Sequence, residues 1–310
     1  ADQEQAVFFA QPIDFLGASF LWDYNPYAST VEGAVNNQLA FNQKTELNTP
    51  FQYHYGIETK SLNLSTSVDY SSQGWTSFMG ISIGHQSYVR EGYFKNGLFP
   101  DASYGKNERQ HFQTWGAKGG VSYAITGRHR LEIKGQFILK PPAYKNLFIN
   151  PRENYYTVPF SRNERAQQVS LDYLWQGIPF TFKTTFYWIN RKHLQEVSYY
   201  FADGLGGDEA LFVQEITKGI QHKHLGIESS FEYEIVPEFR VAAVVAFGDF
   251  RYANSPELFL GSAATAAHSG LKFINGIASF GPSLLKNYRL SGGPQRAYSL
   301  SMHYEDPNFW

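Results

Sequence analysis

Residues 62–70 read Leu62-Asn63-Leu64-Ser65-Thr66-Ser67-Val68-Asp69-Tyr70, and this stretch decides the fold. Its larger side chains fall on the even positions and its small polar ones on the odd positions. Successive side chains of a β-strand point to opposite faces of a sheet, so a strand here has one apolar and one polar face. The stretch therefore predicts an amphipathic β-strand.

The same period of two recurs along the chain. It covers residues 121–125, 131–137, 169–175, 180–188, 225–233 and 298–304. The alternating segments are about 9 to 14 residues long, whereas ordinary strands have about 5–6. A soluble antiparallel sandwich also alternates, but the polar faces here carry acids and small hydroxyl side chains, as a water-filled lumen would. The pattern favours a barrel over a sandwich.

The composition narrows the class of protein. Charged residues make up 17% of the chain and the net charge is -2, which gives no electrostatic case for binding nucleic acid. The chain has no Cys, which excludes a disulfide framework and thiolate chemistry. No run of about 18 apolar residues occurs, so a membrane-spanning helix is excluded. A closed β-barrel needs apolar residues only at alternate positions, so it tolerates the mean hydropathy of -0.37 found here.

Short and long connections alternate between the predicted strands. The short ones, which read as tight turns, are Ser71–Gly74, Thr126–His129, Gln176–Pro179 and Pro237–Phe239. The long ones are Glu91–Gln113, Lys140–Arg165, Arg191–Gly219 and Asn254–Tyr288. Loops this long are uncommon in compact soluble domains, whereas outer-membrane barrels have short periplasmic turns and long extracellular loops. The sequence therefore predicts an all-β, transmembrane antiparallel β-barrel in the outer membrane of a Gram-negative cell.

Aromatic residues gather near both ends of the predicted strands. Tyr70, Trp75, Trp175 and others lie beside the short turns, and Trp188 lies near a long-loop end. Two such belts are typical of barrels at the two bilayer interfaces. We expect about ten to twelve strands from Leu62 onward. Three less regular regions are interpreted as a strand, a long loop and a short loop helix: Phe15–Trp22, Asn25–Asn48 and Pro256–His268.

Several ordered stretches between about residue 80 and the end of the chain resemble one family. They are residues 90–97, 103–106, 115–123, 126–129, 148–152, 198–204, 212–215 and 285–295, the last reading Leu285-Lys286-Asn287-Tyr288-Arg289-Leu290-Ser291-Gly292-Gly293-Pro294-Gln295. In order and spacing they are similar to the C-terminal half of TonB-dependent outer-membrane receptors of the Bacteroidetes type.

That resemblance implies a barrel of about 22 strands closed by an N-terminal plug domain. It implies uptake of a ligand, such as an iron chelate, cobalamin, a glycan or a peptide, energised through TonB, which pulls on the plug. Nothing in residues 1–310 resembles the plug, so we interpret the chain as the C-terminal portion of the barrel. The implied partners are outer-membrane lipids, TonB through the plug region, and a surface lipoprotein or other envelope proteins.

Candidate ligand-binding residues lie on the long loops and the adjoining wall, because a substrate for an importer arrives from that side. Ring-rich polar stretches are favoured, since aromatic faces supply apolar area with little loss of entropy. The residues that meet this description are Tyr93, Asn96, Arg152, Tyr155, Tyr156, Tyr199, Tyr200 and Asp203. The alternative is that they pack loop against loop. The acids Glu228, Glu232 and Glu234 would line the lumen and contact either the ligand or the plug.

No residue pattern indicates catalysis, a cofactor or a metal centre. No Gly-x-Ser-x-Gly elbow occurs, and His129 lies in a predicted turn. His222 and His224 share one strand face, as a metal-ligating pair would, but the sequence supplies no matched further ligand, which favours a polar strand end. The acids between Asp203 and Glu209 fit no EF-hand spacing and indicate a surface loop.

Three other functions stay open at this point. A chain of this length can build a passive channel of about 14–16 strands. A receptor-like barrel can also serve as a subunit of a larger outer-membrane complex. A barrel enzyme, such as a lipase or protease, would need a Ser–His–acid cluster in the lumen.

Overall fold

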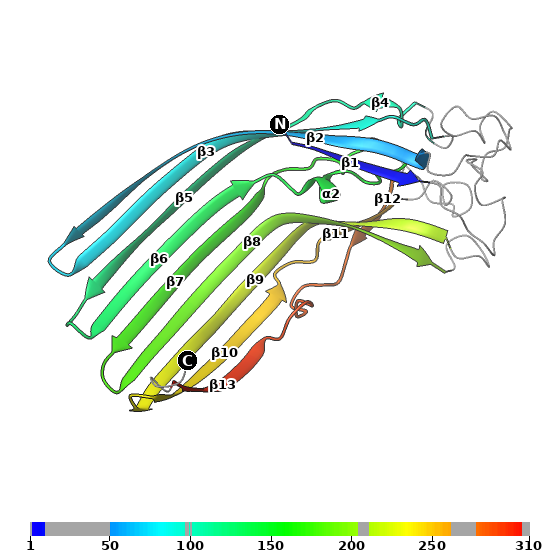
Figure 1. Cartoon of the computed structure of the whole chain (residues 1–310). Coiled ribbons are helices and arrows are strands. Elements are labelled where there is room, and N and C mark those ends of the chain that lie inside the picture. The colour runs from blue at the N-terminus through cyan, green and yellow to red at the C-terminus, as the bar shows by residue number, and fades with distance from the viewer. Residues whose placement is uncertain are drawn as a thin grey trace.

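The computed structural model is an all-β molecule built on one antiparallel sheet (Figure 1). It describes residues 2–9, 50–96, 99, 101–203, 211–261 and 277–305. Within these ranges there are thirteen strands and one helical turn. No helix in the described part of the chain is long and apolar enough to cross a membrane.

Ten strands lie side by side in the order β1-β2-β3-β5-β6-β7-β8-β9-β10-β13. Their bounds are β1 Asp2–Phe9, β2 Pro50–Ser72, β3 Trp75–Gly92, β5 Gln110–Ala124, β6 His129–Lys140, β7 Glu164–Gln176, β8 Phe180–Ala202, β9 Leu211–Val236, β10 Phe239–Tyr252 and β13 Arg296–Tyr304. Three shorter strands lie off this path: β4 Gly105–Lys106, β11 Glu257–Gly261 and β12 Ile277–Pro282. The helical turn is α2, Tyr144–Leu147.

Neighbouring strands pair antiparallel, and the predicted short connections are tight turns at one end of the sheet. The turn between β2 and β3 consists of Gln73 and Gly74, with φ angles of 43° and 84°. Two consecutive residues with positive φ are typical of a type I′ hairpin turn, whose twist matches that of the flanking strands. Glycine suits the second position because it has no Cβ to clash there.

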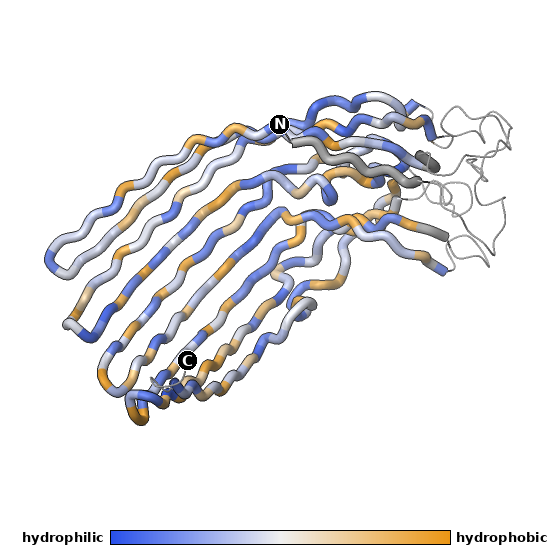
Figure 2. Tube along the Cα trace, viewed as in Figure 1, coloured by the Kyte–Doolittle hydropathy of each residue, from blue (hydrophilic) through white to orange (hydrophobic). Residues whose placement is uncertain are grey.

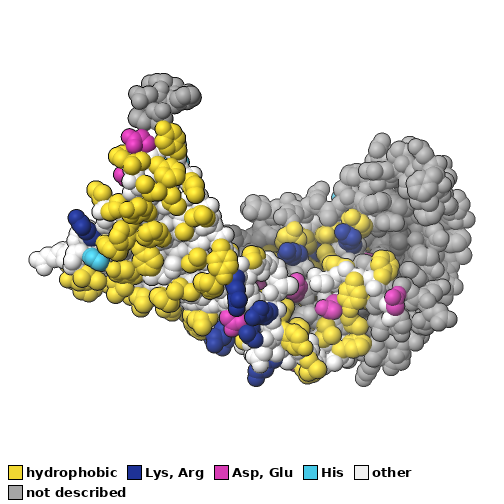
Figure 3. Space-filling model, turned by 90° about the horizontal axis from the view of Figure 1, so that it is seen from below, with side chains coloured by type: hydrophobic (Ala, Val, Ile, Leu, Met, Phe, Trp, Pro, Cys, Tyr) yellow, Lys and Arg dark blue, Asp and Glu magenta, His cyan; other side chains and the backbone are white. Residues whose placement is uncertain are grey.

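The two faces of the sheet differ in chemistry, and this follows from the period of two. The positions that alternate as apolar in the sequence form the outer face, where Leu62, Leu64 and Val68 are 76%, 74% and 68% exposed. The small polar positions, such as Ser65 and Ser67, form the inner face. Figure 2 shows hydrophobic and hydrophilic positions alternating along the strands, and Figure 3 shows hydrophobic side chains covering a broad continuous area. We call this area the apolar band.

The apolar band carries the large exposed side chains of the sheet and has no protein layer packed on it in the described residues. On β3 it runs from Trp75 to Ile83, and on β13 it includes Tyr298 to Tyr304. The buried hydrophobic side chains lie elsewhere, in two small clusters near the long-loop end. The predicted fold class, all-β with an antiparallel barrel-type sheet, is confirmed.

Four predictions of detail were wrong. Strands β2, β8 and β9 have 23, 23 and 26 residues, more than the predicted length. The segment Arg191–Gly219 is not one long loop, because β8 and β9 continue through it as a hairpin and pair Ala202 with Leu211. A register shift beside His193, whose φ is 61°, lets the pairing continue beyond the apolar band.

Residues 257–261, predicted within a loop helix, form strand β11, which pairs with residues 214–218 of β9. The extension of β9 supplies the free strand edge on which β11 forms. The described residues also include a helical turn, α2, where no helix was expected. The predicted strand Phe15–Trp22 and loop Asn25–Asn48 lie outside the described residues, whereas β1 at Asp2–Phe9 was not predicted.

Candidate ligand-binding region at the long-loop end

The segment between β6 and β7, residues 141–163, folds onto the inner face of the sheet. Leu147 and Phe148, at the end of α2, are fully buried against Ile57, Tyr88 and Phe112. Those three side chains come from β2, β3 and β5 and occupy inner-face positions. Apolar burial of this kind stabilises by roughly 1.5–3 kcal/mol per large side chain. This packing explains why apolar residues occur in the segment: it forms an inner layer and is not a solvated loop.

The same segment also reaches the opposite part of the sheet. Ile149 and Val158 pack against Ile216 of β9 and Ile277 of β12. Figure 1 shows α2 between the β1–β2 side and the β8–β12 side. Residues 141–163 therefore bridge two distant regions of the sheet across its inner face. We call this segment the bridging loop.

A buried arginine ties the bridging loop to β3. Arg90 is 1% exposed. Its Nε and Nη2 donate to the carbonyl oxygen of Pro151 at 3.1 and 3.0 Å, and its Nη1 donates to the carbonyl oxygen of Ser103. The guanidinium also lies 5.5 Å from the centre of the Tyr55 ring, a cation–π distance. One side chain thus holds two long connections at once.

The guanidinium of Arg90 stays charged although it is buried. Burial lowers the pKa of Arg90 to about 10, which leaves it protonated at neutral pH. No carboxylate in the described residues forms an ion pair with it, so carbonyl dipoles and rings stabilise the charge. Gly92 permits this arrangement, because a Cβ there would lie 1.8 Å from the Ser103 carbonyl oxygen. Arg90 belongs to a stretch that carries the family resemblance, but its structural role was not predicted from the sequence.

Four of the eight predicted ligand residues come together on and beside the bridging loop. The Arg152 guanidinium lies 5.3 Å above the Tyr53 ring. The Tyr155 hydroxyl donates to the Asp101 carbonyl oxygen at 2.7 Å, and the Tyr155 and Tyr156 rings meet edge to face. The Tyr199 hydroxyl donates to the Ile149 carbonyl oxygen at 2.8 Å.

The hydroxyl groups of Tyr155 and Tyr199 already have hydrogen-bond partners, which limits what they can offer a ligand. Burial raises the pKa of Tyr199 to about 12, and its hydroxyl keeps its proton. Arg152 is exposed and makes no ion pair with any described residue. The cluster therefore offers a ligand mainly ring surface and the exposed cation of Arg152. Such a surface suits a planar or anionic group.

The other four predicted residues make contacts with different groups. The Tyr93 ring packs 4.6 Å from the His54 ring, and the Asn96 backbone N–H donates to Ser103 Oγ. Tyr200 points to the opposite face from Tyr199, and its hydroxyl donates to Glu215. Asp203 follows the last residue of β8 and is exposed. The sequence analysis grouped Tyr199 with Tyr200, although consecutive residues of a strand face opposite sides of the sheet.

Below the bridging loop, the inner wall carries a polar hollow of about 430 Å³. Lys134 Nζ lies 2.9 Å from Asp172 Oδ2 and 3.4 Å from Glu132 Oε2. Asp172 also accepts from the Thr185 hydroxyl at 2.6 Å. The hollow is further lined by Gln168, Tyr187, Ile189, His224, Glu228 and Phe250. This mixture of charges, hydroxyls and rings suits a polar solute that passes along the wall.

Sequence reasoning found the polar face but not this grouping. Lys134, Asp172 and Thr185 occupy three adjacent strands and are brought together by register, because Glu132 pairs with Asp172 and Asp172 with Thr185. The acids Glu228, Glu232 and Glu234 also lie on inner-face positions, as expected, and Glu232 lies 3.9 Å from Arg240. Whether they contact a plug stays a prediction.

The two histidines of the metal hypothesis lie within β9 and not at its end. His222 and His224 point to the inner face, and their ring centres are 6.1 Å apart. The Nε2 atom of each is buried without a hydrogen-bond partner among the described residues. No group of three or more metal-ligating side chains occurs in the part of the chain that the structure describes. The pair alone does not make a metal centre. Most of the acidic loop, residues 204–210, lies outside the described residues.

Comparison with known proteins was made by sequence and by structure. No protein-family model matches the sequence, and no curated protein does. The copper transporter OprC is similar in structure with a TM-score of 0.36 and 11% sequence identity, over 70% of this chain and 43% of that one. This chain therefore spans less than half of the OprC chain. What OprC transports is not carried over to this chain.

Proposed function

We propose that this chain is the C-terminal portion of an outer-membrane transporter barrel that takes up a ligand. The observation that carries the proposal is the apolar band: a broad sheet face of exposed Leu, Ile, Val and aromatic side chains, opposite a polar inner face. Exposing such a face to water costs free energy, at about 25 cal/mol per Å² of apolar surface. In a bilayer it needs no protein cover, because acyl chains solvate it.

The direction of transport follows from the two ends of the sheet. Tight turns lie at one end, and the bridging loop and the other long segments lie at the other. In outer-membrane barrels the turns face the periplasm and the loops face outside. The ligand would then meet Arg152, Tyr155, Tyr156 and Tyr199 first and the polar hollow afterwards. The sequence resemblance supports energising through TonB and the plug of the complete receptor.

Because the chain has no cysteine, topology can be tested with single introduced thiols. Leu284→Cys places one on the long-loop side, where Leu284 is 84% exposed. Gly127→Cys places one in the turn between β5 and β6, where no atom lies within 4 Å of the new Cβ. A membrane-impermeant maleimide is expected to label Leu284→Cys in intact cells, and Gly127→Cys only after the outer membrane is opened. Equal labelling of both in intact cells would contradict the membrane topology.

Uptake is tested with cells that produce the complete protein, using filtered spent culture medium as the probe. Mass spectrometry is expected to show solutes that disappear from the medium only when the protein is present and the proton gradient intact. Arg152→Gln should slow this depletion severalfold, because it removes the exposed cation of the loop cluster. The matched variant Arg128→Gln, in a tight turn, should leave it unchanged. Depletion that survives collapse of the gradient would instead identify a passive channel.

A further inference from the structure

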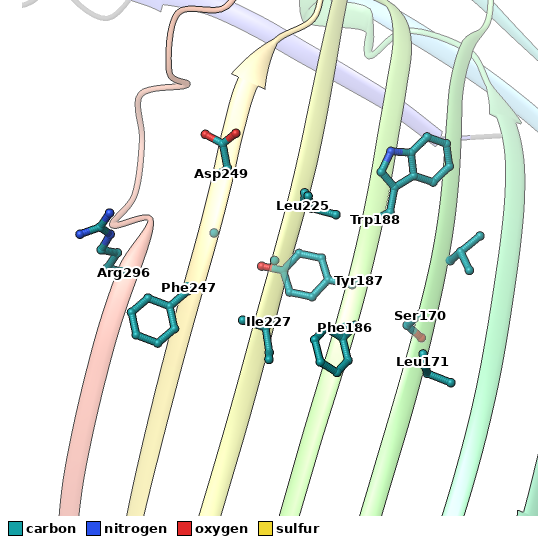
Figure 4. A pocket seen from close by; sticks show the side chains of 13 residues that line it. Ser170, Leu171, Phe186, Tyr187, Trp188, Leu225, Ile227, Phe247, Asp249 and Arg296 are labelled. Carbon is teal, nitrogen blue, oxygen red and sulfur yellow. The ribbon is translucent and has the colours of Figure 1, made fainter.

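The outer face of β7 to β10, together with Arg296 of the neighbouring β13, holds a groove made of two rows of side chains (Figure 4). In each row the residues are cross-strand neighbours. The row nearer the turns contains Leu171, Phe186, Ile227, Phe247 and Arg296, and the next row contains Val169, Trp188, Leu225 and Asp249. The groove has a volume of about 610 Å³, and all but two of these side chains are apolar.

The next two rows toward the long-loop end are polar and carry four cations, beside the neutral Gln167 and Asn190. Lys223 and Arg251 are cross-strand neighbours, and so are Arg165 and Lys192. Two rows on a strand are separated by about 7 Å, so the groove ends within one row of these charges. We call the four residues the cationic belt. In Figure 3, Lys and Arg side chains with a few acidic ones gather where the hydrophobic area ends.

Most of the cationic belt is not neutralised by carboxylates among the described residues. Among the described residues its one ion pair joins Arg251 to Asp249, with Arg251 Nε 2.6 Å from Asp249 Oδ1. Among the described residues, Lys192, Lys223 and Arg165 form no ion pair, and the buried Nε of Arg165 has no hydrogen-bond partner. Like charges directly opposite each other on neighbouring strands destabilise a sheet. An anion that bridges them would remove that cost.

The polar outer-face residues of β2 and Arg109, which directly precedes β5, are arranged differently. Glu58 lies 3.2 Å from Lys60 and 2.5 Å from Arg109, so these charges neutralise one another. Compared with this group, the β7–β10 face carries surplus positive charge. It coincides with the apolar groove, and a ligand that uses both must be amphiphilic.

We propose that this face binds a phosphorylated glycolipid of the outer leaflet, with a head-group phosphate on the cationic belt and an acyl chain in the groove. The inference rests on the proposed function, which places the long-loop end outside. A free phosphate would not use the groove, and a neutral lipid would not use the belt. Basic residues beside a bilayer each strengthen binding of anionic lipid severalfold.

The test uses the intact protein in dodecyl maltoside, with lipid binding followed by native mass spectrometry. The probes are diphosphorylated lipid A, the same lipid without its phosphates, and phosphatidylglycerol. Diphosphorylated lipid A is expected to bind at least about tenfold more tightly than the other two. Removing three belt charges with Lys192→Gln, Lys223→Gln and Arg251→Gln should abolish that preference.

A matched control removes three positive charges elsewhere, with Lys60→Gln, Lys118→Gln and Lys183→Gln. This control should keep the preference, and circular dichroism should show the same β-sheet content in both variants. Equal binding of the phosphorylated and dephosphorylated lipids, or equal loss in both variants, would overturn the proposal. Binding of phosphatidylglycerol as tight as lipid A would overturn the glycolipid assignment. A protein that stays dissolved without detergent would instead overturn the proposed function.

Discussion

Replacing Ile81 with arginine is expected to lower the free energy of unfolding in bilayer vesicles by about 2–4 kcal/mol. Ile81 lies near the middle of the apolar band, 51% exposed, with Thr66 and Ala117 as cross-strand neighbours. At that depth a guanidinium has no water to solvate it, and the loss is largest at the bilayer midplane. Urea titration of the vesicle-inserted protein, followed by tryptophan fluorescence, measures the free energy of unfolding of the variant and of the unmodified protein.

The neighbouring residue provides the control. Ser82 points to the inner face beside Gly116, so Ser82→Arg introduces the same side chain into the polar lumen. This variant is expected to change the free energy of unfolding by less than about 1 kcal/mol. If both variants are equally stable, or if Ser82→Arg is the more damaging, the outer face is not the lipid-facing one.

Removing the buried guanidinium at Arg90 is expected to detach the bridging loop. Arg90→Met keeps much of the side-chain volume but leaves the carbonyl oxygens of Pro151 and Ser103 without donors. Each buried unsatisfied group costs about 1–3 kcal/mol, so the local opening free energy should fall by several kcal/mol. Limited proteolysis of the intact protein should then cut residues 93–109 and 141–163 much faster than in the unmodified protein.

Arg90→Lys separates charge from geometry in the same experiment. An ammonium keeps the positive charge but lacks the planar fork that reaches both carbonyl groups. Intermediate proteolysis is expected for this variant, and the apolar band should remain intact, since the strands below do not depend on Arg90. Unchanged cleavage in Arg90→Met would show that apolar burial of Leu147 and Phe148 holds the loop without the guanidinium.

The positions of the strands could be predicted because each stretch shows the period of two independently of the rest of the chain. The alternation at residues 62–70 determines both an amphipathic strand and which side chains share a face. Gln73 and Gly74, together with the other short connections, determine where strands reverse. The strand ends at the long-loop side were not predictable, because beyond the apolar band the alternation of apolar and polar residues stops. Val197 and Ile216 are therefore strand residues that looked like loop.

The candidate site could be predicted only in part, for a related reason. Rings and cations on the long segments were identifiable by type, and four of them do meet on the bridging loop. The identity of these four residues depends on long-range contacts. An example is the hydrogen bond from Tyr199 to Ile149, which lies 50 positions away in the chain. Nothing in the local sequence distinguishes Arg152, which is exposed, from Arg90, which is buried.

The sequence by itself determined the class of structure: amphipathic strands, their faces and their turns, because each depends on residues a few positions apart. Only the tertiary structure decided the groupings that carry the functional hypotheses. Strand register assembles Lys134 with Asp172 on the inner wall and Lys223 with Arg251 on the outer face. Inward folding of residues 141–163 places a loop across the sheet. These contacts join residues far apart in the chain, so no local pattern encodes them.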